Sequence, residues 1–212
     1  MKILLDIEKT CYKSQSSRGM VVKPKILAFA GSTRTDSFNK KLVRIAADGA
    51  KDTGSDVTII DLRDYKMPLY DGDLEQQDGL PQNAHKLKDL MMAHQGFLIS
   101  APEYNSSISG VLKNTIDWTS RQSQGEDPLA CFKGKVAAIM SASPGGLGGL
   151  RGLVHVRAIL ENMNVLVIPE QIAISKAHEV FNTDGTLKDK KQEEQVKKIG
   201  ANLSKLLLKL TA

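Results

Sequence analysis

Five short and almost continuously apolar runs alternate along the chain with longer segments that repeat apolar residues at helical spacing. Continuous apolar runs are typical of parallel strands covered on both faces, and the segments between them indicate helices packed on such a sheet. The pattern predicts strands at Lys25–Ala30, Asp56–Leu62, Gly96–Ala101, Lys135–Ser141 and Val165–Pro169. It predicts helices at Ser37–Thr53, Pro81–His94, Ser109–Ser120 and Leu150–Asn162, with a last helix from about Leu187 to Leu210.

These strand–helix repeats predict an α/β fold with an open, right-handed, doubly wound parallel sheet. Ligands of such sheets bind beyond the carboxyl ends of the strands, at the point where the strand order reverses. Polar loops are therefore expected after the first, third and fourth strands, and the sequence has them at 31–39, 102–110 and 142–149. Together the three loops predict one shared ligand site.

The first of these loops combines the groups that bind a phosphate. Gly31 permits a tight exit from the strand, and the helix that follows contributes the positive end of its dipole. Side-chain donors come from Ser32, Arg34, Ser37 and Asn39. A plain capped turn would account for Asp36 or Ser37, but not for an arginine within the same loop. The loop therefore indicates an anion site.

The other two loops supply groups that suit a flat heterocycle. In the second loop, Tyr104 offers a ring face and Asn105 can hydrogen-bond the edge of a heterocycle, although these residues also fit a turn with a surface tyrosine. The third loop, from Ser141 to Gly149, has glycine at four of its last five positions. Backbone without side chains can approach a ring closely. Flexible linkers have a similar composition, so its position after the fourth strand is what favours a binding role.

Composition narrows the classes of function. With 212 residues, 41% hydrophobic and 25% charged, the chain has the composition of a globular protein. Its aromatic content of 5% argues against a nucleic-acid platform, and no apolar stretch is long enough to span a membrane. Cys11 and Cys131 form no disulfide framework, which favours a reducing, cytoplasmic location, and the spacing of His, Cys and Asp predicts no metal site. Residues 1–22 are expected to form a disordered extension, and residues 23–212 a single domain.

Four motifs, in this order, give the chain a family resemblance. They are Gly31-Ser-Thr-Arg34-Thr-Asp-Ser37-Phe-Asn39, Pro102-Glu-Tyr-Asn105, Gly110-Val-Leu-Lys113-Asn114-Thr-Ile-Asp117-Trp118 and Ser143-Pro-Gly-Gly146. On these motifs the chain resembles the NADPH-dependent FMN reductases, a flavodoxin-like group that includes quinone, chromate and azo-dye reductases. The resemblance covers about residues 24–175.

The resemblance implies a flavodoxin-like three-layer fold, with a five-stranded parallel sheet in the order 2-1-3-4-5 and helices on both faces. It implies bound FMN, NADPH as co-substrate and a quinone, chromate, azo compound, ferric complex or flavin as acceptor, in a ping-pong cycle. It also implies a homodimer or homotetramer. The flavin carries the chemistry, so no catalytic acid, base or nucleophile is expected. The implied cofactor-binding residues are Ser32, Arg34, Ser37, Phe38, Asn39, Pro102, Glu103, Tyr104, Asn105, Ser143, Gly145 and Gly146.

Other functions of this fold class fit the residues less well. A low-molecular-weight phosphatase needs a cysteine inside the first loop, and a Rossmann-type site needs a G-x-G-x-x-G motif there; this loop has neither. A flavodoxin-like electron carrier, or a redox sensor without rapid NADPH turnover, is the alternative. Such carriers tend to be acidic, whereas this chain has a net charge of +5, and its glycine-rich third loop leaves space above a ring. Both features favour a reductase.

Overall fold

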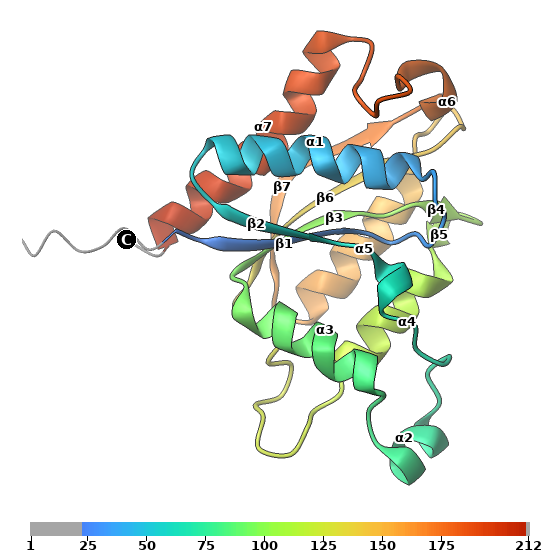
Figure 1. The fold of residues 1–212 in the computed structure, drawn as a ribbon, viewed down its shortest axis with the longest axis vertical. Coiled ribbons are helices and arrows are strands. Elements are labelled where there is room, and N and C mark those ends of the chain that lie inside the picture. The colour runs from blue at the N-terminus through green and yellow to red at the C-terminus, as the bar shows by residue number, and fades with distance from the viewer. Residues whose placement is uncertain (1–22, 211–212) are drawn as a thin grey trace, which may run out of the picture.

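A five-stranded parallel sheet forms the centre of the protein. The structure, a computed structural model, describes residues 23–210, so the predicted disordered extension over residues 1–22 lies outside the described residues. Neighbouring strands pair in parallel in the order β2-β1-β3-β6-β7 (Figure 1). Because β4 and β5 form a separate hairpin, this order is the predicted 2-1-3-4-5, and the α/β fold class is confirmed. The strands of the sheet are β1 (Lys25–Ala30), β2 (Asp56–Ile60), β3 (Gly96–Ser100), β6 (Val136–Ala142) and β7 (Leu166–Ile174).

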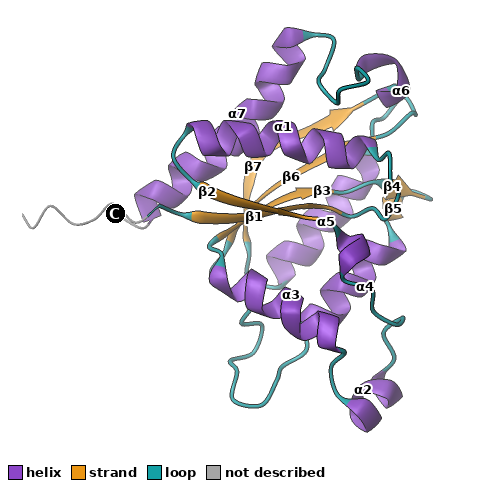
Figure 2. Cartoon of the chain, in the orientation of Figure 1, coloured by secondary structure: helices purple, strands orange, loops and turns teal. Residues whose placement is uncertain are grey.

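Helices cover both faces of the sheet and complete a three-layer sandwich (Figure 2). Alternate residues of β1 enter opposite cores, with Ile26 packing toward one face and Leu27 toward the other. Since side chains alternate along a strand, a continuously apolar strand requires helices on both sides. Helices α1 (Phe38–Asp52) and α7 (Lys190–Leu210) lie on one face, and α3 (Gln82–Ala93), α4 (Gly110–Thr119) and α5 (Leu150–Asn162) lie on the other.

Helices α1 and α7 cross at reciprocal glycines. A Cβ atom placed on Gly49 of α1 would overlap the carbonyl of Lys197, and one placed on Gly200 of α7 would overlap the carbonyl of Ala46. The two backbones are therefore in direct contact, which only glycine allows at these positions. Helix α1 begins where the loop 31–39 ends, so α7 supports the helix that follows the predicted phosphate loop.

Two strands end two or more residues away from the predicted position. Strand β2 ends at Ile60, because Asp61 accepts a hydrogen bond from the Arg63 amide and starts a short 3-10 helix, η1 (Leu62–Asp64). Strand β7 continues through Pro169, where the prediction ends it, to Ile174. β7 is an edge strand, and its pairing with β6 shifts register between Ala137 and Ile139. A proline is tolerated at an edge or at such a bulge, since no ladder hydrogen bond is lost.

Besides η1, four short elements were not predicted. Helix α2 (Gly72–Asp78) buries no residue, so it has no apolar periodicity to detect. Strands β4 (Glu103–Tyr104) and β5 (Ser107–Ile108) form a two-stranded hairpin in the second predicted loop. Helix α6 (Ala177–Val180) is a single turn after β7. Among the helices within residues 23–210, none is long and apolar enough to cross a membrane.

Candidate functional site

The loops after β1, β3 and β6 meet around a cavity of about 60 Å³. Since a cavity of about 10–15 Å³ on this measure holds one water, this cavity has room for a small group such as a phosphate. Three residues that the sequence also nominates, Asn105, Gly145 and Gly146, do not line it. The lining residues are Ser32, Arg34, Ser37, Phe38, Asn39, Pro102, Glu103, Tyr104, Ala142, Ser143 and Pro144.

The start of helix α1 presents hydrogen-bond donors that the protein itself does not use. Ser37 is the N-cap residue, and its hydroxyl makes no capping bond, although its carbonyl accepts from the amides of Lys40 and Lys41 at 3.0 and 3.1 Å. Within residues 23–210, the amides of Ser37, Phe38 and Asn39 have no protein acceptor. Unpaired amides at a helix N-terminus, with the helix dipole behind them, attract an anion.

The charges around this loop leave one cation available. Arg34 is exposed and forms no ion pair in the described part of the chain, whereas Asp36 is paired with Lys41 at 2.7 Å. That pairing holds the pKa of the Asp36 carboxyl below its usual value. The side chains of Ser32 and Ser37 are buried beside Arg34. The loop therefore combines a free guanidinium with two enclosed hydroxyls.

Asn39 ties the three strand ends together. Its Nδ2 donates to the Ala142 carbonyl at 2.8 Å, and its Oδ1 accepts from the Ser100 hydroxyl at 2.8 Å and from the Ala142 amide at 3.0 Å. These bonds join the start of α1 to the ends of β3 and β6. The sequence nominated Asn39 as a ligand donor, but at most one of its side-chain N–H groups is left for a ligand.

The β4–β5 hairpin carries Tyr104 beside the cavity. Asn105 and Ser106 form its two-residue turn with φ values of 51° and 67°, the backbone conformation of the tight hairpin turns that match strand twist. The turn leaves Tyr104 49% exposed, with its ring free for contact. Ser107 on β5 lies 2.8 Å from Nδ1 of His155, which connects the hairpin to helix α5.

Glu103 fastens the same hairpin to helix α5. Its carboxylate accepts from Arg151 Nε at 2.8 Å and from the Gly152 amide at 3.2 Å. Burial alone would raise the pKa of Glu103, but the bonds from Arg151 and Gly152 hold that pKa below its usual value. Glu103, which the family resemblance assigns to the flavin site, therefore also positions the hairpin against α5.

The loop after β6 is held by its own backbone. The Ser143 amide donates to the Ile174 carbonyl at 3.0 Å, and the Gly145 carbonyl accepts from the Lys176 amide at 3.2 Å. Gly148 and Gly149 have φ values of 64° and 95°, which favour glycine. A Cβ at Gly146 would meet nothing within 4 Å, so the lack of a side chain there is not required by the fold.

Next to the first loop, Lys40, Asp61 and Arg63 form a cluster of charged residues that was not predicted from the sequence. Arg63 donates from Nη1 to the Thr35 hydroxyl at 3.0 Å and from Nη2 to the Asp61 carboxylate at 2.8 Å. Lys40 of α1 donates to the same carboxylate at 2.7 Å. Burial alone would raise the pKa of Asp61, but the bonds from Arg63 and Lys40 lower it to about 2. Nothing in the sequence indicated this cluster, because Asp61 lies inside the strand predicted at Asp56–Leu62.

Known proteins resemble this chain over most of its length. The family model for NADPH-dependent FMN reductases matches residues 24–179. The chain is 35% identical over 191 residues to a probable NADPH:quinone oxidoreductase 2 of Oryza sativa subsp. japonica, covering 88% of this chain and 90% of that protein. It is 34% identical to an NAD(P)H-dependent FMN reductase of Pseudomonas aeruginosa, covering 81% and 89%. Among solved structures, FerB, a flavoenzyme NAD(P)H:(acceptor) oxidoreductase of Paracoccus denitrificans, superposes with a TM-score of 0.73 at 27% identity, covering 88% of this chain and 98% of FerB.

Proposed function

Because the chain belongs to the NADPH-dependent FMN reductase family, we propose that the loop 31–39 binds the phosphate of FMN and that the other two loops flank its ring. The protein is an NAD(P)H-dependent flavin oxidoreductase with FMN as its cofactor. The chemistry that FMN supplies when bound is transfer of a hydride from NAD(P)H to a second substrate. The residues of this chain bind and orient the partners in that transfer.

The observation that carries this proposal is the set of unused donors at the start of α1. Arg34, the hydroxyls of Ser32 and Ser37 and the free amides of the first helical turn suit a phosphate. In the described part of the chain, the only carboxylate that lines the cavity is Glu103, and Arg151 neutralises it. An anion in this cavity would therefore meet donors and no uncompensated negative charge.

The part of the site that we propose holds the flavin ring offers contact surfaces for it and is assigned no acid or base. Tyr104 offers an exposed ring face, and Gly145 and Gly146 keep side chains out of the space beside Ser143. No side chain is assigned as a catalytic acid, base or nucleophile, since the cofactor carries the redox step. Quinones are the first acceptors to test, because several relatives are named as quinone reductases; chromate, azo compounds, ferric complexes and flavins follow.

A homodimer or homotetramer is part of the proposal. Three large apolar side chains are exposed beside the hairpin: Leu147 at 52%, Leu150 at 44% and Val154 at 61%. Leu147 precedes α5, and Leu150 and Val154 lie on it. Apolar side chains grouped in this way indicate an interaction surface. Sedimentation equilibrium should give a dimer or larger for the wild type and a monomer for Val154→Asp. We also place the enzyme in the cytoplasm, as its cysteine usage indicates.

The visible spectrum of the purified protein, followed by NADPH addition without oxygen, tests the function. The expected result is a bound-flavin spectrum that bleaches promptly with NADPH and returns when a quinone is added. A flavin that stays oxidised would instead support an electron carrier or sensor. No flavin binding after addition of FMN would show that the three-loop cavity has been misassigned.

A further inference from the structure

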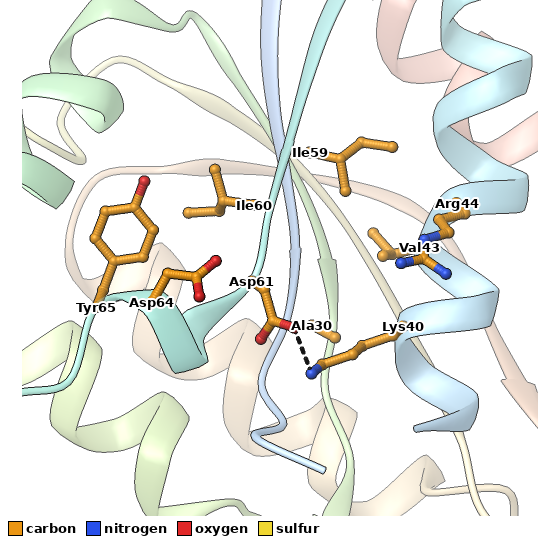
Figure 3. Close-up of a pocket in the computed structure, with 9 residues that line it drawn as sticks. All are labelled: Ala30, Lys40, Val43, Arg44, Ile59, Ile60, Asp61, Asp64 and Tyr65. Carbon is orange, nitrogen blue, oxygen red and sulfur yellow. Dashed lines mark hydrogen bonds and ion pairs between the residues drawn. The ribbon is translucent and has the colours of Figure 1, made fainter. Parts of the chain in front are cut away.

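A second and larger cavity lies on the outer side of the same loop. It measures about 340 Å³ and opens over the edge strand β2, between helix α1 and η1 (Figure 3). It shares no lining residue with the smaller cavity. Ala30 and Lys40, two of its residues, directly flank the segment 31–39. The lining residues are Ala30, Lys40, Val43, Arg44, Ile59, Ile60, Asp61, Asp64 and Tyr65.

Two charged side chains of this cavity are unengaged. Lys40 is satisfied by Asp61, but Arg44 on α1 and the Asp64 side chain on η1 form no hydrogen bond or ion pair within residues 23–210. Figure 3 shows Arg44 on one wall of the cavity, and Asp64 and Tyr65 on the opposite wall. A cation and an acceptor that face one cavity from opposite sides can bind the two ends of a polar ligand.

The remaining wall is apolar, and the local charge is positive. Val43, Ile59 and Ile60 line the cavity, and Ile59 is 38% exposed although it belongs to the sheet. Together with the phenol ring of Tyr65 they offer a surface for a flat, weakly polar group. Counting Arg63, which is bound to Asp61, three cations surround two carboxylates, so a net positive charge is left for an anion. A ligand that matches the apolar wall, the acceptor and the positive charge has a planar group, a hydrogen-bond donor and an anion. A nucleotide combines all three in its base, its ribose hydroxyls and its phosphate.

We propose that this cavity binds the phosphorylated adenosine end of NADPH, with Arg44 contacting the 2′-phosphate. The inference rests on the proposed function, which brings NADPH to the neighbouring loop. A guanidinium suits a phosphate because it donates two parallel hydrogen bonds. Asp64 is placed to accept from a ribose hydroxyl or from the adenine amino group. NADH lacks the 2′-phosphate, so Arg44 would determine the preference between the two co-substrates.

Steady-state kinetics of Arg44→Ala with NADPH and NADH test the role of Arg44. The expected result is a KM for NADPH raised about tenfold, the effect of losing one charge-assisted contact, with kcat and bound flavin unchanged. The KM for NADH should change by less than about twofold, within the small effect of a surface substitution. Equal effects on the two co-substrates, or no effect on either, would overturn the inference.

Lys51→Ala is the matched control. Lys51 lies on the same helix, carries the same charge and is outside the cavity, where it pairs with Asp48. If loss of positive charge alone weakened the encounter with NADPH, Lys51→Ala would raise its KM as much as Arg44→Ala does. We expect the NADPH KM of Lys51→Ala to equal that of the wild type.

A binding measurement separates this inference from the proposed function. Adenosine 2′,5′-bisphosphate, titrated calorimetrically into the FMN-loaded protein, should bind the wild type, and about tenfold more weakly the Arg44→Ala variant. Adenosine 5′-monophosphate should bind the wild type more weakly than the bisphosphate does. Equal affinity of the bisphosphate for both proteins would refute the assignment of Arg44, whereas an enzyme that neither NADPH nor NADH reduces would refute the proposed function itself.

Discussion

The first and last loops of the candidate site, 31–39 and 142–149, both contain glycine and both follow a central strand, yet they are held mainly by different groups. One backbone bond joins the Gly31 amide to the Ser100 carbonyl, but side chains hold the rest of the first loop: Arg63 holds Thr35, and Asn39 bonds to the ends of β3 and β6. Beyond Ala142, which bonds to Asn39, the last loop is held by backbone bonds of Ser143 and Gly145 to β7 and to the start of α6. Among residues 23–210, the helix-terminal amides of the first loop consequently have no acceptor, whereas the Ser143 and Gly145 amides of the last loop are bonded.

The difference shows how one site can offer two kinds of surface. A loop anchored mainly by side chains can direct its unused amides at an anion, because few of those amides are needed for support. A loop anchored by its backbone offers few donors, but without side chains at Gly145 and Gly146 it can lie close to a ring. The predictions that follow test this contrast, beginning with the largest expected effect.

Asn39→Ala should remove the connection between the two loops. The substitution leaves the Ser100 hydroxyl and both backbone groups of Ala142 without their partner, so the FMN-free protein should lose about 3 kcal/mol of unfolding free energy. Urea denaturation measures this loss. Ser100→Ala removes only one of these bonds and should cost about 1 kcal/mol. Equal stabilities for the two variants would show that Asn39 does not hold the loops together.

Gly149→Ala should damage the last loop, and Gly146→Ala should not. Gly149 has φ +95°, and a Cβ there would overlap the Ser141 side chain, so we expect a loss of about 2–3 kcal/mol in unfolding free energy. Gly146 has open space around its Cα, so its alanine variant should stay within ~0.5 kcal/mol of the wild type. Thermal unfolding of the two variants measures both losses in stability. Similar losses would mean that clash and strain do not explain these glycines.

Arg34→Ala should affect ligand binding in the first loop without affecting its fold. Because Arg34 is exposed and has no ion pair among the described residues, FMN-free stability should not change. FMN affinity should fall by about 2 kcal/mol, roughly 30-fold, the worth of a charge-assisted contact. Fluorescence titration with FMN measures the dissociation constant. Arg34→Lys keeps the charge but loses the paired donors of the guanidinium, so its affinity for FMN should lie between those of the wild type and Arg34→Ala. An Arg34→Ala variant that binds FMN normally would exclude Arg34 from the site.

Low pH should weaken the bonds of Asp61 that support the first loop, and should leave the last loop unaffected. The pKa of Asp61, about 2 in the folded protein, is lower than the ordinary aspartate value of 3.8, so Asp61 stabilises the fold above about pH 4 and loses that contribution as the pH falls toward 2. The stability difference between wild type and Asp61→Asn should shrink by ~1–2 kcal/mol over this range. Residues 142–149 contain no ionisable side chain, so the cost of Gly149→Ala should be independent of pH. Denaturant titrations at several pH values would reveal a constant difference for Asp61→Asn if its charge played no part.

The sheet and the meeting of the three loops around one cavity could be predicted because both depend on local signals. Apolar runs identify buried strands, and the direction of a parallel sheet then places three loops at one end. The tasks of Asn39 and Asp61 could not be predicted, since they depend on which atoms meet after residues far apart in the chain come together. The β4–β5 hairpin pairs only two residues on each strand, and Pro169 indicated a strand end because the sequence does not show that β7 is an edge.

The glycine crossing between α1 and α7 has a consequence for the order of events during synthesis. Of the described elements, α7 is the last to be made, yet it packs on the helix whose first turn would hold the FMN phosphate. The apolar face of α1 cannot be fully covered until α7 has been translated, because Val196, Ile199 and Leu203 complete that core. Cofactor loading is therefore expected to follow translation of α7, and a nascent chain stalled before residue 190 should not retain FMN.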